Sequence, residues 1–450
     1  MTPASEPPGR GGLGPVESGA VPGKRILYVS WGFPPFSGSG MANPLAAVNA
    51  LATRGHQVTV LSADSDAFDL VSGSDWSLTD RISQSVTVVR VDQPRAMLDT
   101  VINRWSEARR RNAGDYPQWM CELVHDIFPE PVANPWAWYP AWLPNARATA
   151  RALHQARPFD LVIATILPAA SAGVALALNA ATGVPFVIYE RDSWVFSPFT
   201  GEPYPDSGRS RPMLEMAFER AHQVWYINTP LADLHRREFA AWADRIREVR
   251  NGWDPESLPR PVEPRARAGQ AGLVVRYVGT SSRQFPWEFV TSAWQLARAQ
   301  SPLLRESVLE FVGPAPADRM PGDFDHVTLA GPRPREELWD VYSGTDILLF
   351  VKEGGGMATS GKIYEYAATG LPIVSSMVAD HDARHVLAGR PLWFDAAGHT
   401  PEALAAALVA AAERAPGVEE TPAAREHAER FRRDQVFSSA FAQLEESLGW

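Results

Sequence analysis

Cysteine is almost absent from the sequence: Cys121 is the single one among 450 residues. One thiol cannot form a disulfide within the chain, and it offers no thiolate cluster for zinc or an iron–sulfur centre. This composition fits a reducing compartment, so we expect a cytoplasmic protein.

Positive charge is also scarce, with 42 Lys and Arg against 52 Asp and Glu and a net charge of -10. Nucleic-acid binding depends on clustered Lys and Arg that contact phosphates, so we expect no nucleic-acid partner. The dense basic run at residues 109–111 is more often a solvated helix face.

We expect neither a signal peptide in residues 1–23 nor a membrane span in residues 161–189. Residues 1–23 are rich in Pro, Gly and small side chains and have no basic start before an apolar core, which predicts a disordered leader. Residues 161–189 carry no charge and are long enough to cross a bilayer. Pro168 and Thr182-Gly183 interrupt them, however, which predicts a strand, a helix and a second strand.

What the sequence has is a repeated alternation of short β-rich runs with helical segments. Strands covered by helices on both faces are expected to be continuously apolar, as LVIATI and FVIY within residues 161–189 are. We predict the α/β class, with two Rossmann-like domains that enclose a cleft. The predicted strands are RILYVSW, QVTVLSA, VTVVRVD, LVIATI, FVIYE and VWYIN in the first half, and VVRYVGT, VLEFVG, VTLAG, DILLFV, PIVSS and LWFDA in the second.

Proline marks the join between the two halves. Residues 254–272 hold four prolines and no hydrophobic periodicity, which predicts a linker. The first domain is then expected at residues 24–253 and the second at residues 273–425. Residues 426–450 are expected to form a C-terminal helix that returns to the first domain.

The most specific local pattern is SGKIYEYAATGLPIVSS, residues 360–376. Lys362 and Glu365 are three residues apart, so they share one face in the first turn of a helix that Gly370 ends. The free N–H groups of such a turn suit a diphosphate, to which Lys362 adds an ammonium, while Glu365 is placed to accept the hydroxyls of a ribose. The competing interpretation is a solvated Lys–Glu pair.

This segment resembles the donor-binding helix of the family-four retaining glycosyltransferases. Further segments resemble the family's motifs in the same chain order, and the likeness spans most of residues 24–450. It implies the two-domain GT-B fold, with an acceptor on the first domain and a nucleoside-diphosphate sugar on the second. The segments are SWGFPPFSGSG (residues 30–40), FVIYERDSWVFSP (186–198), NGWD (251–254) and the strand and loop at 277–283.

Carried onto this sequence, the resemblance implies that Lys362 and Arg283 neutralise the donor diphosphate and that Glu365 holds the ribose. Arg333 falls where the family's backbone meets the base. Glycines are implied where backbone amides approach phosphate or sugar, and these are Gly38, Gly40, Gly279, Gly355 and Gly356.

The sequence departs from the family pattern at two places. The acid that the family often has eight positions before the ribose-binding glutamate is Met357 here, and the nearest acid is Glu353. Where many members have a histidine, this chain has Arg191-Asp192. Asp192 would position or deprotonate the acceptor hydroxyl and Arg191 would stabilise phosphate charge, or the two form an internal pair that shapes the loop.

We therefore expect a glycosyltransferase that needs no metal and, on the family likeness alone, retains the anomeric configuration. The alternatives are a nucleotide-sugar epimerase or phosphorylase on the same fold, and a non-catalytic sugar-nucleotide-binding partner. Asp64 and Asp66 are interpreted as a solvated loop, and His381 with His385, expected on one helix, lack the further ligands of a metal site.

The acceptor is left open among a glycan, a lipid-linked molecule and a natural product. Three tryptophans lie in residues 134–144. They indicate a packed core, an apolar acceptor site or peripheral contact with the inner membrane face.

Overall fold

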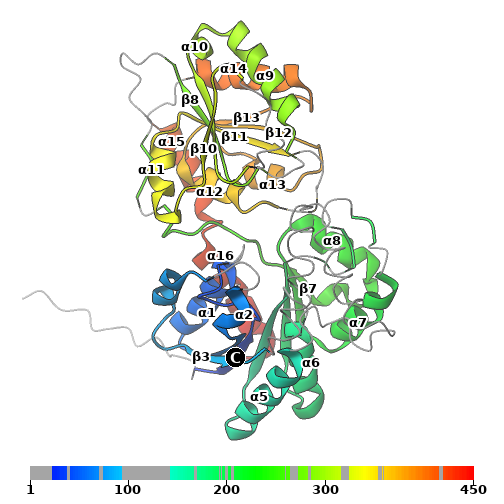
Figure 1. The fold of residues 1–450 in the computed structure, drawn as a ribbon. Coiled ribbons are helices and arrows are strands. Elements are labelled where there is room, and N and C mark those ends of the chain that lie inside the picture. Colours follow the sequence, from blue (N-terminus) through cyan, green and yellow to red (C-terminus); the bar gives the residue numbers. More distant parts are fainter. Residues whose placement is uncertain are drawn as a thin grey trace, which may run out of the picture.

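The structure is a computed structural model, and it describes residues 23–37, 41–69, 74–93, 142–166, 170–191, 193, 195–197, 201–203, 207–258, 260–263, 272–281, 285–315, 324–352, 357, 359–414 and 419–450. Within these residues two parallel sheets, each covered by helices, form two domains (Figure 1). The predicted α/β class with two Rossmann-like domains is confirmed.

The first sheet has the strand order β3-β2-β1-β4-β5-β6-β7. Its central strand β4 is buried along its whole length, which explains why the sequence there is apolar without alternation. The strands are β1 (Arg25–Val29), β2 (Gln57–Ala63), β3 (Thr87–Val91), β4 (Leu161–Ile166), β5 (Phe186–Glu190), β6 (Gln223–Tyr226) and β7 (Ile246–Glu248).

Helices cover both faces of this sheet and make a separate core on each. The helical elements are α1 (Ala42–Thr53), α2 (Ser65–Asp69), η1 (Trp76–Arg81), α5 (Trp142–Ala156), α6 (Ala170–Thr182), α7 (Ser207–Arg220), α8 (Thr229–Glu238) and η3 (Ala240–Arg245). The predicted division of residues 161–189 is confirmed, because β4, α6 and β5 occupy them. No described helix has the length and apolar character needed to cross a membrane.

The second sheet has the order β10-β9-β8-β11-β12-β13, again parallel. Its strands are β8 (Val274–Val278), β9 (Val308–Val312), β10 (Val327–Gly331), β11 (Ile347–Lys352), β12 (Ile373–Met377) and β13 (Trp393–Asp395). The helices are α9 (Trp287–Gln300), α10 (Pro302–Arg305), η5 (Arg335–Glu337), α11 (Leu338–Ser343), α12 (Lys362–Thr369), α13 (Ala383–Leu387), α14 (Pro401–Glu413) and α15 (Glu420–Glu429).

The last helix, α16 (Arg433–Leu448), lies against α1 of the first domain (Figure 1). Its buried side chains Phe437, Phe441 and Leu444 join the core on one face of the first sheet. The chain therefore passes between the domains twice.

The two passages run side by side. The Trp253 amide donates to the Phe431 carbonyl and the Arg433 amide donates to the Trp253 carbonyl, each at 2.9 Å. Gly252 has φ +77, and a Cβ there would lie 2.5 Å from the Phe431 carbonyl oxygen, so glycine is required at this approach. These hydrogen bonds join the two interdomain segments into one hinge.

The structure tests three of the sequence predictions, which concern the strands, His381 and the tryptophan segment. The predicted strands are all found, but β7 was missed, because three residues with two charges show no β pattern. His381 precedes α13, which begins at Ala383, so its placement on one helix with His385 was wrong. Of the tryptophan segment, Trp142 is a buried core residue of α5, and residues 134–141 lie outside the described residues, as do residues 1–22. The limits of the domains and linker stay predictions.

Candidate functional site

Helix α12 begins at the carboxyl edge of the second sheet, after β11, and Gly370 ends it in the left-handed conformation with φ +80. Tyr366 fixes the helix beside β8, since its hydroxyl accepts from the Val278 amide at 2.6 Å and donates to the Val278 carbonyl at 3.1 Å. This is the edge at which open α/β sheets bind ligands. The apolar face of α12 thereby directs its polar first turn to the edge.

Lys362 and Gly279, two predicted site residues, meet at this edge. The Lys362 ammonium donates to the Tyr277 hydroxyl at 2.6 Å and lies over the Tyr277 ring, 3.8 Å from its centre. Gly279 has φ +131, and a Cβ there would lie 2.7 Å from the Lys362 nitrogen. Only glycine leaves room for the ammonium in this position.

Lys362 is held in a site that disfavours its charge. Burial, and next the nearby charge of Lys352, lower the pKa of Lys362 to about 7, against a smaller upward influence from Glu365. An ammonium of this kind gains from an approaching anion, because the anion supplies the stabilisation that water would otherwise provide.

Glu365 lies in the same first turn, half-buried, and its Oε2 accepts a hydrogen bond from the Tyr342 hydroxyl at 3.3 Å. Burial raises the pKa of Tyr342, and the charge of Glu365 raises it further, so this hydroxyl stays a donor. Tyr342 orients Glu365 and was not foreseen, since no sequence spacing links α11 with α12.

The remaining predicted residues fall in other places. Arg333 is exposed after β10 and pairs with Glu337 at 3.7 Å. Arg191 is half-buried directly after β5; burial raises the pKa of Tyr189 to about 12, and the charge of Arg191 opposes that rise. The others lie outside the described residues, namely Gly38, Gly40, Asp192, Arg283, Gly355 and Gly356.

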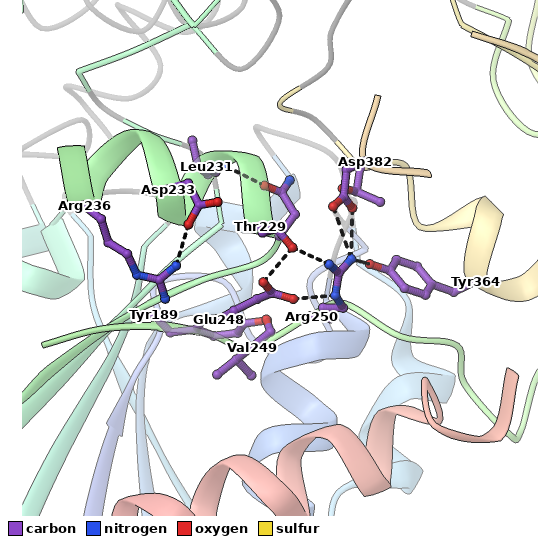
Figure 2. Close-up of polar contacts among 12 residues, drawn as sticks. Tyr189, Thr229, Leu231, Asp233, Arg236, Glu248, Val249, Arg250, Tyr364 and Asp382 are labelled. Atoms are coloured by element: carbon purple, nitrogen blue, oxygen red, sulfur yellow. Dashed lines mark hydrogen bonds and ion pairs between the residues drawn. The ribbon is translucent and has the colours of Figure 1, made fainter. Parts of the chain in front are cut away.

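A polar network that the sequence did not predict joins the two domains at Arg250 (Figure 2). Its guanidinium donates to both oxygens of Asp382, at 3.3 and 3.0 Å, and to the Thr229 hydroxyl at 2.6 Å. It also pairs with Glu248 at 2.5 Å. Burial acts to lower the pKa of Arg250, but Tyr364, Asp382 and Glu248 outweigh it and raise that pKa. Arg250 stays charged in this setting.

A second contact between the domains involves Met357, which stands where the resemblance led us to expect an acid. The side-chain amide of Asn228 donates to the Met357 carbonyl at 2.8 Å. The Met357 side chain packs on the first-domain core, where a Cβ on Gly201 would lie 2.7 Å from its methyl carbon. Met357 is therefore a docking residue in this structure.

Asp254, in the hinge, gathers three arginines around one carboxylate. Its Oδ2 lies 2.7 Å from Arg81, 3.1 Å from Arg335 and 3.6 Å from Arg433. Burial acts to raise the pKa of Asp254, but the arginines, Arg81 foremost, bring it below its ordinary value. The cluster ties the first domain, the second domain and α16 together.

A cavity of about 260 Å³ lies beside the hinge, between β7 and α16. The predicted donor residues that the structure describes do not line it, so it is separate from the edge that holds Lys362.

Among the described residues no group of three or more His, Cys, Asp or Glu is placed to hold a metal ion. Asp64 accepts from the Ala67 amide at 3.1 Å, which gives its carboxylate a local structural role at the start of α2.

Known proteins resemble both halves of the chain. Residues 45–257 match Glycosyltransferase Family 4, and residues 273–414 match Glycosyl transferases group 1. A search of curated proteins found no match to the sequence.

Solved structures resemble the whole chain at low identity, which shows a shared fold. Sucrose-phosphate synthase from Thermosynechococcus elongatus is 16% identical, with a TM-score of 0.58 over 95% of this chain and 99% of that one. HepE of Anabaena, in complex with UDP and glucose, is 14% identical, with a TM-score of 0.54 over 94% and 100%. A glycosyltransferase from Rickettsia africae is 13% identical, with a TM-score of 0.57 over 95% and 99%.

Proposed function

Because the chain belongs to glycosyltransferase family 4, group 1, and is a nucleotide-sugar-dependent transferase, we propose that its second domain holds the donor at the start of α12. The sugar then passes to a hydroxyl of an acceptor on the first domain. The observation that carries the proposal is the position of the Lys362 ammonium, which lies against Gly279 in the same helix turn as Glu365.

On the donor side, the diphosphate lies against Lys362 at the positive N-terminal end of α12, and the ribose hydroxyls bond to Glu365. The glycine at 279 lets the phosphates approach the backbone. HepE, which shares the fold, was crystallised with UDP and glucose, and this supports a nucleoside diphosphate as the leaving group.

The transfer step is driven by electrostatic stabilisation of the departing diphosphate. Negative charge grows on the phosphate oxygen as the anomeric carbon separates from it, and we assign Lys362 and the positive end of the α12 dipole to that charge. No metal is needed for this, and the family likeness supports retention of the anomeric configuration.

On the acceptor side, Arg191 follows β5 at the carboxyl edge of the first sheet, and we assign Asp192 to the acceptor hydroxyl and Arg191 to the phosphate charge. The glycines at 38 and 40, Arg283 and the 355–356 pair stay assigned to the donor, and Arg333 to the base. The acceptor is a glycan, a lipid-linked molecule or a natural product, and the single cysteine supports a cytoplasmic site of action.

The first test identifies the donor and then removes the two central side chains. A thermal-shift screen with nucleoside diphosphates and their sugars should show stabilisation of about 2.7 kcal/mol at 100 times the dissociation constant. We expect Lys362→Ala to lower kcat/KM about 100-fold or more, since it removes a charge from the developing oxyanion. We expect Glu365→Ala to raise the donor KM about tenfold, since it removes charged hydrogen bonds.

Glu288→Ala is the matched control, because Glu288 also lies in the first turn of a second-domain helix, α9, and should leave both constants unchanged. Wild-type activity in both site variants would overturn the assignment. Product analysis with and without acceptor separates transfer from epimerisation, and donor binding without turnover by any acceptor would show a non-catalytic protein.

A further inference from the structure

We infer that Arg250 and Asp382 are positioning residues for donor binding, which tie the start of the Lys362 helix to the first domain. The inference rests on the proposed role of Lys362 as a diphosphate ligand. It adds that the first domain, through Arg250, sets the position of Lys362 in the second domain.

The link runs from one domain to the other in three contacts. Arg250 follows β7 in the first domain and donates twice to Asp382, whose side chain is fully buried in the second domain (Figure 2). Asp382 in turn accepts from the hydroxyl of Thr359 at 2.5 Å. Thr359 is buried and stands three residues before Lys362.

First-domain residues fix the orientation of the Arg250 guanidinium, which also contacts Asp382 of the second domain. Glu248 pairs with Arg250, and Thr229 accepts from Arg250 while donating to Glu248 at 2.7 Å. These partners leave the planar guanidinium few orientations, so its remaining donors point at Asp382. Positioning by such a held fork is more specific than a free charge provides.

Met357 supplies a second anchor on the same short segment. Its carbonyl is held by Asn228 at 2.8 Å, and its side chain packs against Gly201. Asn228 is itself fixed, because its side-chain oxygen caps α8 by accepting from the Leu231 amide at 2.9 Å. Residues 357 and 359 are thus both held from the first domain, directly and through Asp382, just before α12 begins.

Separating the domains would cost free energy, because the buried Asp382 carboxylate would lose its contact with Arg250. A buried carboxylate that loses its cation is strongly destabilised, whereas Arg250 would keep Glu248. The structure with the domains in contact therefore holds Thr359, and through it the first turn of α12, in one place. Donor binding in that turn then depends on contact between the domains.

Thr359→Val tests the link at its narrowest point, because it replaces the hydroxyl by a methyl group of the same size. We expect the dissociation constants of UDP, ADP, GDP, CDP and dTDP, measured by titration calorimetry, to rise about tenfold for each nucleotide that the wild type binds. Thr359→Ser keeps the hydroxyl and should restore wild-type affinity. At saturating donor, kcat should change less than twofold, a split between KM and kcat that a general loss of folding would not give.

Arg250→Met should weaken nucleotide binding to a similar degree, and combining it with Thr359→Val should add little, because both break one chain of contacts. The control is Arg236→Met, which breaks the Asp233–Arg236 pair within the first domain (Figure 2) and should leave affinity unchanged.

Equal affinity in Thr359→Val and wild type, or full additivity in the double variant, would overturn the inference alone. If the wild type binds none of the five nucleotides, the proposed function falls and the inference falls with it.

Discussion

At the scale of single residues, Lys362 combines a low pKa with close contact to Tyr277 and Gly279. Partial burial favours contact between this ammonium and a diphosphate, since the anion replaces stabilisation that water no longer fully provides. Its charge in the empty site depends on pH near neutrality, and that dependence can be measured.

We expect nucleotide affinity to fall as pH rises from 7 to 9. A bound diphosphate raises the pKa of Lys362 above its value of about 7 in the empty site, so binding takes up a proton over this window. The dissociation constant should then rise by up to about tenfold per pH unit, measured by titration calorimetry. Lys362→Arg stays charged throughout and should show a flat profile in the same window; a flat wild-type profile would contradict the lowered pKa.

The sequence predicts Lys362 and Glu365 because their spacing on one helix turn is a local pattern. It does not predict the role of Met357, which was expected to mark a missing acid and instead packs on the first domain. Arg250 and Asp382 also escape prediction, because their contact joins residues with no fixed spacing along the chain.

At the scale of helices and strands, α16 completes the first domain although it is made last. Phe437 packs edge-on against Tyr189 at 5.8 Å between ring centres, and Phe441 lies 5.6 Å from Trp225. Arg54, which directly follows α1, and His56 both form hydrogen bonds with Glu445 of α16. Apolar burial and ion pairs together attach this helix.

We expect Phe441→Ala to destabilise the protein by about 3–5 kcal/mol, since Phe441 is fully buried and leaves a cavity beside Trp225. Urea unfolding followed by tryptophan fluorescence measures the change. Gln443→Ala, on the exposed face of the same helix, should have almost no effect. Similar stability in both variants would show that α16 is not part of the first-domain core.

The regular elements are predictable because their cause is local. Apolar runs bounded by Gly or Pro give twelve of the strands, whereas β7 (Ile246–Glu248) forms only because β6 is beside it to supply hydrogen-bond partners. Its end nevertheless matters, since Arg250 lies two residues after it.

At the scale of the whole molecule, Asp254 joins Arg81 of the first domain, Arg335 of the second and Arg433 of α16. We expect Asp254→Asn to lower the free energy of unfolding by about 3 kcal/mol at pH 7, since it leaves the buried Arg433 without its anion. Because the pKa of Asp254 is lowered in the fold, this stabilisation is present above its ordinary value of 3.8 and is lost as pH falls below it.

The control for that variant is Asp434→Asn, which breaks an exposed pair with Arg432 and should cost less than about 1 kcal/mol. Urea unfolding at pH 7 and at a pH well below 3.8 compares the two variants, and the difference between Asp254→Asn and wild type should shrink at the lower pH. Equal stability of Asp254→Asn and wild type at pH 7 would show that the hinge arginines need no common anion.

The return of α16 to the first domain also sets an order for biosynthesis. The ribosome synthesises the first sheet first, the whole second domain next and α16 after it. Tyr189 and Trp225 belong to the sheet face that α16 covers, so their native burial waits until α16 has left the exit tunnel. While the second domain is being synthesised, the apolar face of the first sheet therefore lacks α16. A chaperone that shields this face would bind the nascent chain during that period.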